Sequence, residues 1–69
     1  MTPAKKLRMA MLQLNTTQVE LARRTNQTQA NLSAKICGDK FTIYEYQKLV
    51  KALGCELEFN IILPDGNRV

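Results

Sequence analysis

The stretch TQVELARRTNQTQANLSAKI, residues 17 to 36, decides the fold of this chain. Its residue types predict two short helices joined by a tight turn. Thr17 and Glu20 have the spacing of a capping box, which would begin the first helix. Asn26 lies at the break, where asparagine tolerates a left-handed backbone, and Thr28 can cap the second helix. The stretch is therefore predicted to be a helix-turn-helix.

The second helix of this motif has two chemically different sides. Leu32 and Ile36 are four residues apart and would pack against a core. The opposite side carries uncharged amide, hydroxyl and methyl groups, from Gln29, Ala30, Ser33 and Ala34. In a helix-turn-helix protein the second helix lies in the major groove of DNA. We therefore expect this uncharged side to face base edges.

The stretch resembles the helix-turn-helix of the lambda-repressor/Cro-like family, also called the XRE family, of bacterial and phage DNA-binding domains. The matching positions are Gln18 at the start of the first motif helix, Leu21-Ala22 in its middle, Thr28-Gln29 at the opening of the second helix and Leu32 as its central aliphatic residue. The later segment FTIYEYQKLVKALGCELEFNIILPDG, residues 41 to 66, is similar to a compact bacterial branch that ends in a β segment. The resemblance covers roughly the whole chain.

The chain departs from the family pattern inside the motif. Asn26 stands where glycine is usual, and Thr25 and Gln27 stand where apolar residues are usual. Lys35 occupies a position that is usually apolar, and we expect Ile36 to replace it as the buried anchor.

The resemblance implies that the protein binds double-stranded DNA in a sequence-specific way, as a transcriptional regulator, with residues 28–37 as the recognition helix. Gln29 would make a paired hydrogen bond to adenine, worth about 1–3 kcal/mol of discrimination. Gln18, with nearby backbone N–H groups, would hold a phosphate. The expected DNA-binding residues are Gln18, Thr28, Gln29, Ala30, Asn31, Ser33, Ala34 and Lys35, of which Asn31 and Lys35 would meet the DNA backbone.

Two further helices are predicted on either side of the motif. Thr2 and Pro3 open the first, whose apolar stripe consists of Leu7, Ala10, Met11 and Leu14. The later helix should begin with a second capping box, Thr42 and Glu45, and a hydrophobic staple, Phe41 and Tyr46. Its stripe consists of Ile43, Tyr46, Leu49, Val50 and Leu53, and Gly54 stops it. Gly38 is expected to cap the end of the recognition helix.

From Cys55 onward the spacing of the apolar residues changes from that of a helix to every second residue. Cys55, Leu57, Phe59, Ile61 and Leu63 alternate with mostly polar residues, which predicts a half-buried strand. Only Arg68 and Val69 follow the turn at residues 64–67, so a local hairpin would leave most of the strand unpaired. We therefore expect residues 56–62 to pair with a second copy, which would make the protein a homodimer.

The expected architecture is mainly α: a four-helix, lambda-repressor-like helix-turn-helix domain with a C-terminal β-strand or short hairpin. Residues 1–69 would form one domain. The expected helices span about 3–14, 17–25, 28–37 and 42–53, and the strand spans about 55–63.

The net charge of +4 is unevenly distributed. Residues 1–36 hold six Lys and Arg against one Glu, whereas residues 37–69 hold four against five Asp and Glu. The basic half contains the helix-turn-helix, as a phosphate-binding surface requires, although ordinary solvated side chains would account for any single charge.

Other classes of function find less support in the sequence. The chain has no histidine, no evident pair of catalytic carboxylates and no glycine-rich phosphate loop, so we expect neither an enzyme nor a cofactor. Cys37 and Cys55 lack metal-type spacing and are expected to be reduced thiols in a cytoplasmic protein without a metal site. No apolar run approaches the ~20 residues that span a membrane. The alternative is a protein-interaction module on the same scaffold, such as an antitoxin or a phage accessory protein.

Overall fold

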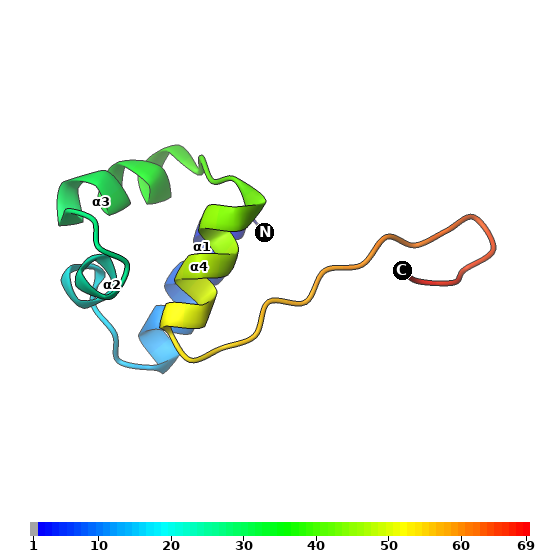
Figure 1. Cartoon of the computed structure of the whole chain (residues 1–69), viewed down its shortest axis with the longest axis horizontal. Coiled ribbons are helices and arrows are strands. Elements are labelled where there is room, and N and C mark those ends of the chain that lie inside the picture. Colours follow the sequence, from blue (N-terminus) through cyan, green and yellow to red (C-terminus); the bar gives the residue numbers. More distant parts are fainter. Residues whose placement is uncertain (1) are drawn as a thin grey trace.

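The computed structural model describes residues 2–69, and its regular structure is helical. The helices are α1 (Pro3–Gln13), α2 (Gln18–Arg24), α3 (Gln29–Gly38) and α4 (Ile43–Ala52). They form a helical body, from which residues 55–69 extend as a tail that ends in a hairpin (Figure 1). No helix among the described residues is both long and apolar enough to cross a membrane.

A threonine directly precedes each of these helices and caps its N-terminal end. The hydroxyl oxygens of Thr2, Thr17, Thr28 and Thr42 each accept a hydrogen bond from the backbone N–H three residues later, at 3.0–3.2 Å. Each bond satisfies an N–H group that has no partner inside the helix, and a cap of this kind is typically worth about 1 kcal/mol. The four predicted threonine caps are confirmed.

The two predicted capping boxes are only half formed. Their threonine halves are present, but the carboxylates of Glu20 and Glu45 turn toward basic side chains. Glu20 pairs with Arg23 and Arg24 of its own helix, and Glu45 pairs with Lys35 of α3. A cation competes well for a carboxylate because both partners of an ion pair are charged, whereas a backbone N–H is neutral.

The core lies where the four helices meet. Its largest fully buried side chains are one leucine from each helix, Leu7, Leu21, Leu32 and Leu49. The hydroxyl of Tyr46 also donates a 2.8 Å hydrogen bond to the carbonyl of Pro3, which ties α4 to the start of α1. Burial, with a smaller effect of the Asp39 charge, raises the pKa of this hydroxyl.

The apolar stripes predicted for α1 and α4 each include one residue, at one end, that is exposed in the structure. Leu14 is 46% exposed because α1 ends at Gln13 and Asn15 takes a left-handed conformation that turns the chain away. Ile43 is 60% exposed, although it is the first residue of α4. The predicted staple is confirmed, since the rings of Phe41 and Tyr46 meet edge to face with centroids 5.5 Å apart.

The end of α3 also differs from the prediction. Gly38 lies within the helix, and Asp39 is the capping residue, with a left-handed φ of 52°. The Asp39 carboxylate accepts a 2.9 Å hydrogen bond from the N–H of Ala4, in the first turn of α1. An acidic side chain is favoured there by the helix dipole. Asp39 therefore joins the end of one helix to the start of another.

The strand predicted at residues 55–63 does not form in the single chain. The backbone of Ile61 makes two hydrogen bonds with Val69, at 2.8 and 3.0 Å, and the N–H of Leu63 donates to Asn67 at 2.7 Å. These bonds close the short hairpin that was one of the two expected forms, with an isolated bridge between Ile62 and Arg68. In the part of the chain that the structure describes, no second strand lies beside the residues that precede this hairpin.

Candidate nucleic-acid interface

The outer side of α3 is open to solvent. Thr28, Gln29, Ala30, Asn31 and Ala34 are exposed and Ser33 is partly buried. Leu32 and Ile36, on the opposite side, are 0% and 2% exposed. The structure therefore confirms that the second motif helix has one buried side and one free, uncharged side.

Helix α2 and the turn after it hold α3 in place. Leu21 and Ala22 of α2 are buried, and the small Ala22 side chain lies in the same core as Leu32. Asn26 takes the predicted left-handed conformation, with φ of 55°, and the N–H of Gln27 then donates to the Ala22 carbonyl at 3.0 Å. Gln18 lies half-buried at the first position of α2.

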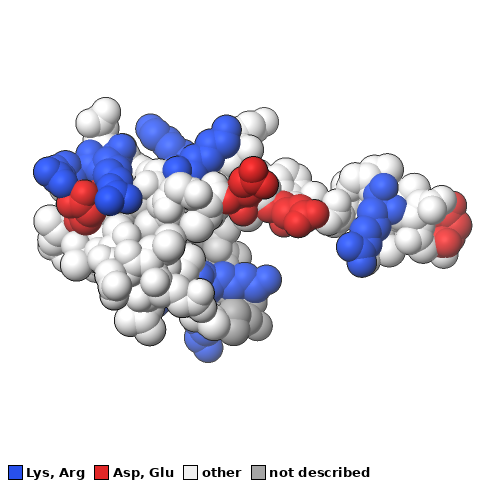
Figure 2. All heavy atoms as spheres, turned by 90° about the horizontal axis from the view of Figure 1, so that it is seen from below, with Lys and Arg blue, Asp and Glu red and all other residues white. Residues whose placement is uncertain are grey.

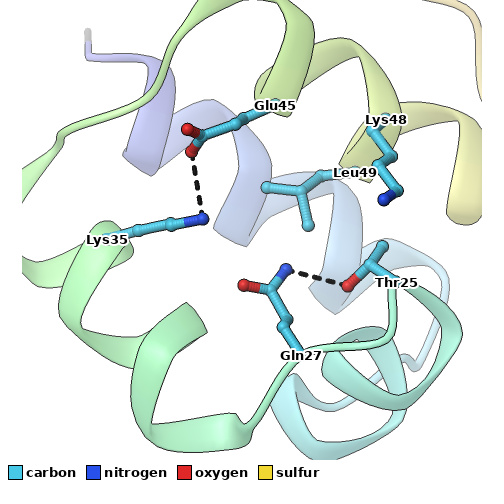
Figure 3. Close-up of a pocket in the computed structure, with 6 residues that line it drawn as sticks. All are labelled: Thr25, Gln27, Lys35, Glu45, Lys48 and Leu49. Atoms are coloured by element: carbon cyan, nitrogen blue, oxygen red, sulfur yellow. Dashed lines mark hydrogen bonds and ion pairs between the residues drawn. The ribbon is translucent and has the colours of Figure 1, made fainter.

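Hydrogen bonds replace the apolar contacts that the family pattern has in this turn. Thr25 is only 5% exposed, and its hydroxyl donates to the Leu21 carbonyl at 2.9 Å. The same oxygen accepts a 2.8 Å bond from the side-chain amide of Gln27 (Figure 3). A buried hydroxyl is costly without partners, and these two hydrogen bonds satisfy the hydroxyl of Thr25.

Lys35 points toward α4, away from the uncharged side of α3. Its ammonium group lies 3.1 Å from the Glu45 carboxylate, and the pair lines one side of a small pocket (Figure 3). The pocket has a volume of about 140 Å³ and is lined by Thr25, Gln27, Lys35, Glu45, Lys48 and Leu49. Position 35 is usually apolar in the family that the sequence resembles. A lysine can stand there in this chain because the Glu45 carboxylate faces it. The sequence does not reveal this pair, because Lys35 and Glu45 are ten positions apart on different helices.

The arginines of α2 have different surroundings. Both pair with Glu20, and the hydrogen bond from Arg23 is the main reason why the pKa of that carboxyl lies below its ordinary value. Arg24 also donates a 3.1 Å hydrogen bond to the carbonyl of Ala52, at the end of α4. The Arg23 side chain is 75% exposed and the Arg24 side chain 44%. Arg24 thus joins two helices, and Arg23 is the freer cation.

This difference predicts unequal effects of removing the two charges. Arg24→Ala should lower the free energy of unfolding by about 1 kcal/mol, because a helix-terminal carbonyl of α4 loses its donor. Arg23→Ala is the matched control, with the same change of charge on the same helix, and should change stability by less than about 0.5 kcal/mol. Urea unfolding followed by circular dichroism measures both. Equal midpoints for the two variants would contradict a structural role for Arg24.

Charge is distributed unevenly over the molecule. Lys and Arg side chains gather in several groups on the helical body, and acidic side chains mark the point where the tail leaves it (Figure 2). The acidic residues of that segment are Glu56 and Glu58. An anionic ligand such as DNA would therefore be attracted to the helical body and repelled from the root of the tail.

The structure brings most of the expected DNA-binding residues together on and beside α3, with Gln18 on the neighbouring helix and Lys35 directed elsewhere. Comparison with known proteins finds no matching family model, no similar curated protein and no similar solved structure.

Proposed function

We propose that this protein binds double-stranded DNA in a sequence-specific way and acts as a transcriptional regulator, with α3 in the major groove. The observation that carries the proposal is the free, uncharged side of α3, a helix whose other side is buried against the core. A helix of this width fits the major groove, where each base pair presents a distinct pattern of donors and acceptors. The resemblance to the lambda-repressor/Cro-like family supports the same function.

Gln29 is the proposed base-reading residue. It is the first residue of α3, directly after the Thr28 cap, and its side chain is exposed. The N-terminal part of a recognition helix is the part that reaches base edges. Ala30, Ser33 and Ala34 would contact base edges or thymine methyl groups beside it.

The phosphate contacts would come from the edges of this surface. Gln18 and Thr28 stand at the N-terminal ends of α2 and α3, where the helix dipole attracts anions. Asn31 is exposed beside the base-reading side. Lys35 would have to break its ion pair with Glu45 before it could contact a phosphate. We therefore expect Lys35 to contribute least to DNA binding among the proposed phosphate contacts.

The proposal includes a second copy of the chain, paired through residues 56–62. Two recognition helices related by a two-fold axis would read half-sites about 34–36 Å apart, one turn of DNA. The experiment that tests the whole proposal is selection of binding sites from random duplexes, followed by sequencing. Recovery of a palindrome is the expected result. Failure to enrich any sequence over the starting pool would contradict the proposed function.

The Gln29→Ala variant tests the base-reading role. Loss of a paired hydrogen bond should weaken binding to the selected site by about 1–3 kcal/mol and relax the preference at one base position. Gln13→Ala makes the same change at an exposed position outside the motif and should leave binding unchanged. Titration of labelled specific and random duplexes measures the effect. If Gln29→Ala weakens both duplexes equally, Gln29 does not read a base.

A second candidate function, a protein-interaction module such as an antitoxin or a phage accessory protein, is favoured by the tail. Phe59, Ile61 and Ile62 are all more than 60% exposed. The end of α3 also lacks the cations expected near DNA, since Cys37 and Gly38 carry no charge. Salt separates the two functions, because phosphate contacts make affinity for DNA fall steeply as salt rises.

A further inference from the structure

We propose that residues 56–62 of two copies pair antiparallel in one defined register, centred on Phe59. This inference rests on the homodimer included in the proposed function, but it does not depend on DNA binding. It starts from the exposed apolar side chains on one face of the tail, which are Phe59 at 62%, Ile61 at 65%, Leu63 at 38% and Val69 at 70%, whereas Ile62 lies on the opposite, polar face. Exposed apolar side chains that gather on one face are typical of an interaction surface.

The hairpin determines which edge of the tail is free. Ile61 and Leu63 direct their backbone N–H groups toward the returning residues 67–69. Successive residues of an extended chain direct these groups to opposite edges. The N–H and C=O groups of Ile62 and Asn60 therefore face the other edge, where no backbone partner exists among the described residues. An open edge of this kind is a template for another strand.

The charges and the proline on the tail select the register. A pair centred on Glu58 would place two glutamates directly opposite each other, which is destabilising. A pair centred on Asn60 would place Pro64 opposite Glu56, and proline has no N–H to donate. A pair centred on Phe59 places Glu58 opposite Asn60 and Glu56 opposite Ile62. It therefore avoids both faults and uses the edge that the hairpin leaves free.

This register also matches side chains on the apolar face. The two Phe59 rings would meet at the two-fold axis, Leu57 would face Ile61 of the partner subunit, and Cys55 would face the partner's Leu63. Leu57 and Phe59 already line an apolar groove of about 260 Å³ at the root of the tail, together with Pro3, Phe41, Thr42, Ile43 and Tyr46. The partner's Ile61 would lie at the mouth of this groove. The register thus also explains why Ile43, on the core stripe of α4, is exposed in the single chain.

The polar face gains an attraction between opposite charges. Arg68 stands opposite Ile62 in the hairpin bridge. In the proposed register Ile62 stands opposite the partner's Glu56, so Arg68 and that glutamate lie on the same face, one strand apart. The arginine side chain is long enough to reach across one strand toward a carboxylate. The complementarity of charge favours a second copy of this chain as the occupant of the open edge.

Disulfide trapping tests the register. In a chain without native thiols (Cys37→Ser, Cys55→Ala), one cysteine is placed at a time by Glu58→Cys, Phe59→Cys or Asn60→Cys. Two cysteines bridge only when their Cα atoms lie within about 7 Å, and in the proposed register only residue 59 meets its own copy. Under mild oxidation without DNA, Phe59→Cys should form covalent dimers about tenfold faster than the other two. Faster bridging at residue 58 or 60 would overturn the register.

Phe59→Cys removes the Phe59 ring and could itself weaken the dimer, so a second variant that keeps this ring is needed. Leu63→Cys, with native Cys55 kept and Cys37→Ser, should form two bridges per dimer, because residues 55 and 63 face each other between copies. Absence of bridging in both variants, with a wild-type chain that is dimeric by sedimentation, would overturn the interface. A wild-type chain that stays monomeric at high concentration would overturn the pairing itself. The trapping and sedimentation experiments are done without DNA, so they test the pairing alone. A failure of the proposed DNA binding would appear only in the duplex selection.

Discussion

Replacing Leu32 with alanine should lower the free energy of unfolding by about 2–5 kcal/mol. Leu32 is 0% exposed and belongs to a core cluster that draws on all four helices. Natural domains are stable by only about 5–15 kcal/mol, and short chains lie at the low end of that range. The variant should therefore be partly or wholly unfolded at room temperature. Circular dichroism during urea unfolding measures the loss.

Leu12→Ala is the matched control for this variant. It removes the same atoms from a helix, but Leu12 is 78% exposed on α1. Its effect should stay within about 0.5 kcal/mol, as is usual for surface positions. Equal losses from the two variants would mean that α3 is not anchored through Leu32.

The contrast with Gln29 on the same helix separates folding from binding. Gln29→Ala should leave the urea midpoint unchanged, because the side chain is exposed and alanine is a good helix former. Leu32→Ala should remove stability and DNA binding together. Opposite sides of α3 would thus carry separate roles, one in the core and one in recognition.

The start of each helix could be predicted because the physics there is local. A threonine hydroxyl reaches an N–H three residues later whatever the rest of the chain does, so the four caps follow from the residue types. The left-handed Asn26 is local in the same sense. The staple of Phe41 and Tyr46 needs only one turn of helix between its two residues.

Periodicity predicted the buried side of each helix but not its limits. Leu14 and Ile43 follow the stripes of α1 and α4, yet both are exposed. An apolar stripe indicates which side of a helix faces the core. It does not indicate how far along the helix the neighbouring helices cover that side. Asp39 shows the same limit, because its contact with Ala4 depends on how α3 and α1 meet.

The partners of charged side chains could not be predicted from spacing alone. Glu20 and Glu45 both have the capping-box spacing, and both bind cations instead. For Glu45 the partner is Lys35, on another helix, so only the packing of α3 against α4 reveals it. This pair changes the candidate site, because it directs Lys35, the one cation among the expected DNA-binding residues, away from the uncharged side of α3.

The C-terminal tail is the part of the chain in which the predicted strand lacks a neighbour. The alternation from Cys55 to Leu63 is that of a half-buried strand, but Phe59 and Ile61 are exposed. A strand needs a neighbour for its N–H and C=O groups, and the hairpin satisfies only the last few residues. The pattern therefore predicts an assembled state that one copy cannot reach by itself.

Asn60→Pro should dissociate the proposed dimer and leave the helices intact. The alternation set by the hairpin directs the Asn60 N–H to the open edge, so proline would remove one ladder donor from each copy. Two lost hydrogen bonds of about 0.5–1.5 kcal/mol each should raise the dimer dissociation constant roughly fivefold or more. Sedimentation over a range of concentrations measures this constant.

Asn60→Ala is the control, because it removes the same side chain but keeps the N–H group. It should sediment as the wild type does. The helical signal should be equal in all three proteins, since residue 60 lies in the tail that extends from the helical body (Figure 1). The proline variant should also bind a palindromic duplex more weakly, because two linked recognition helices bind more tightly than one. If the proline variant keeps the dissociation constant of the alanine variant, the open edge of the tail does not hold the dimer together.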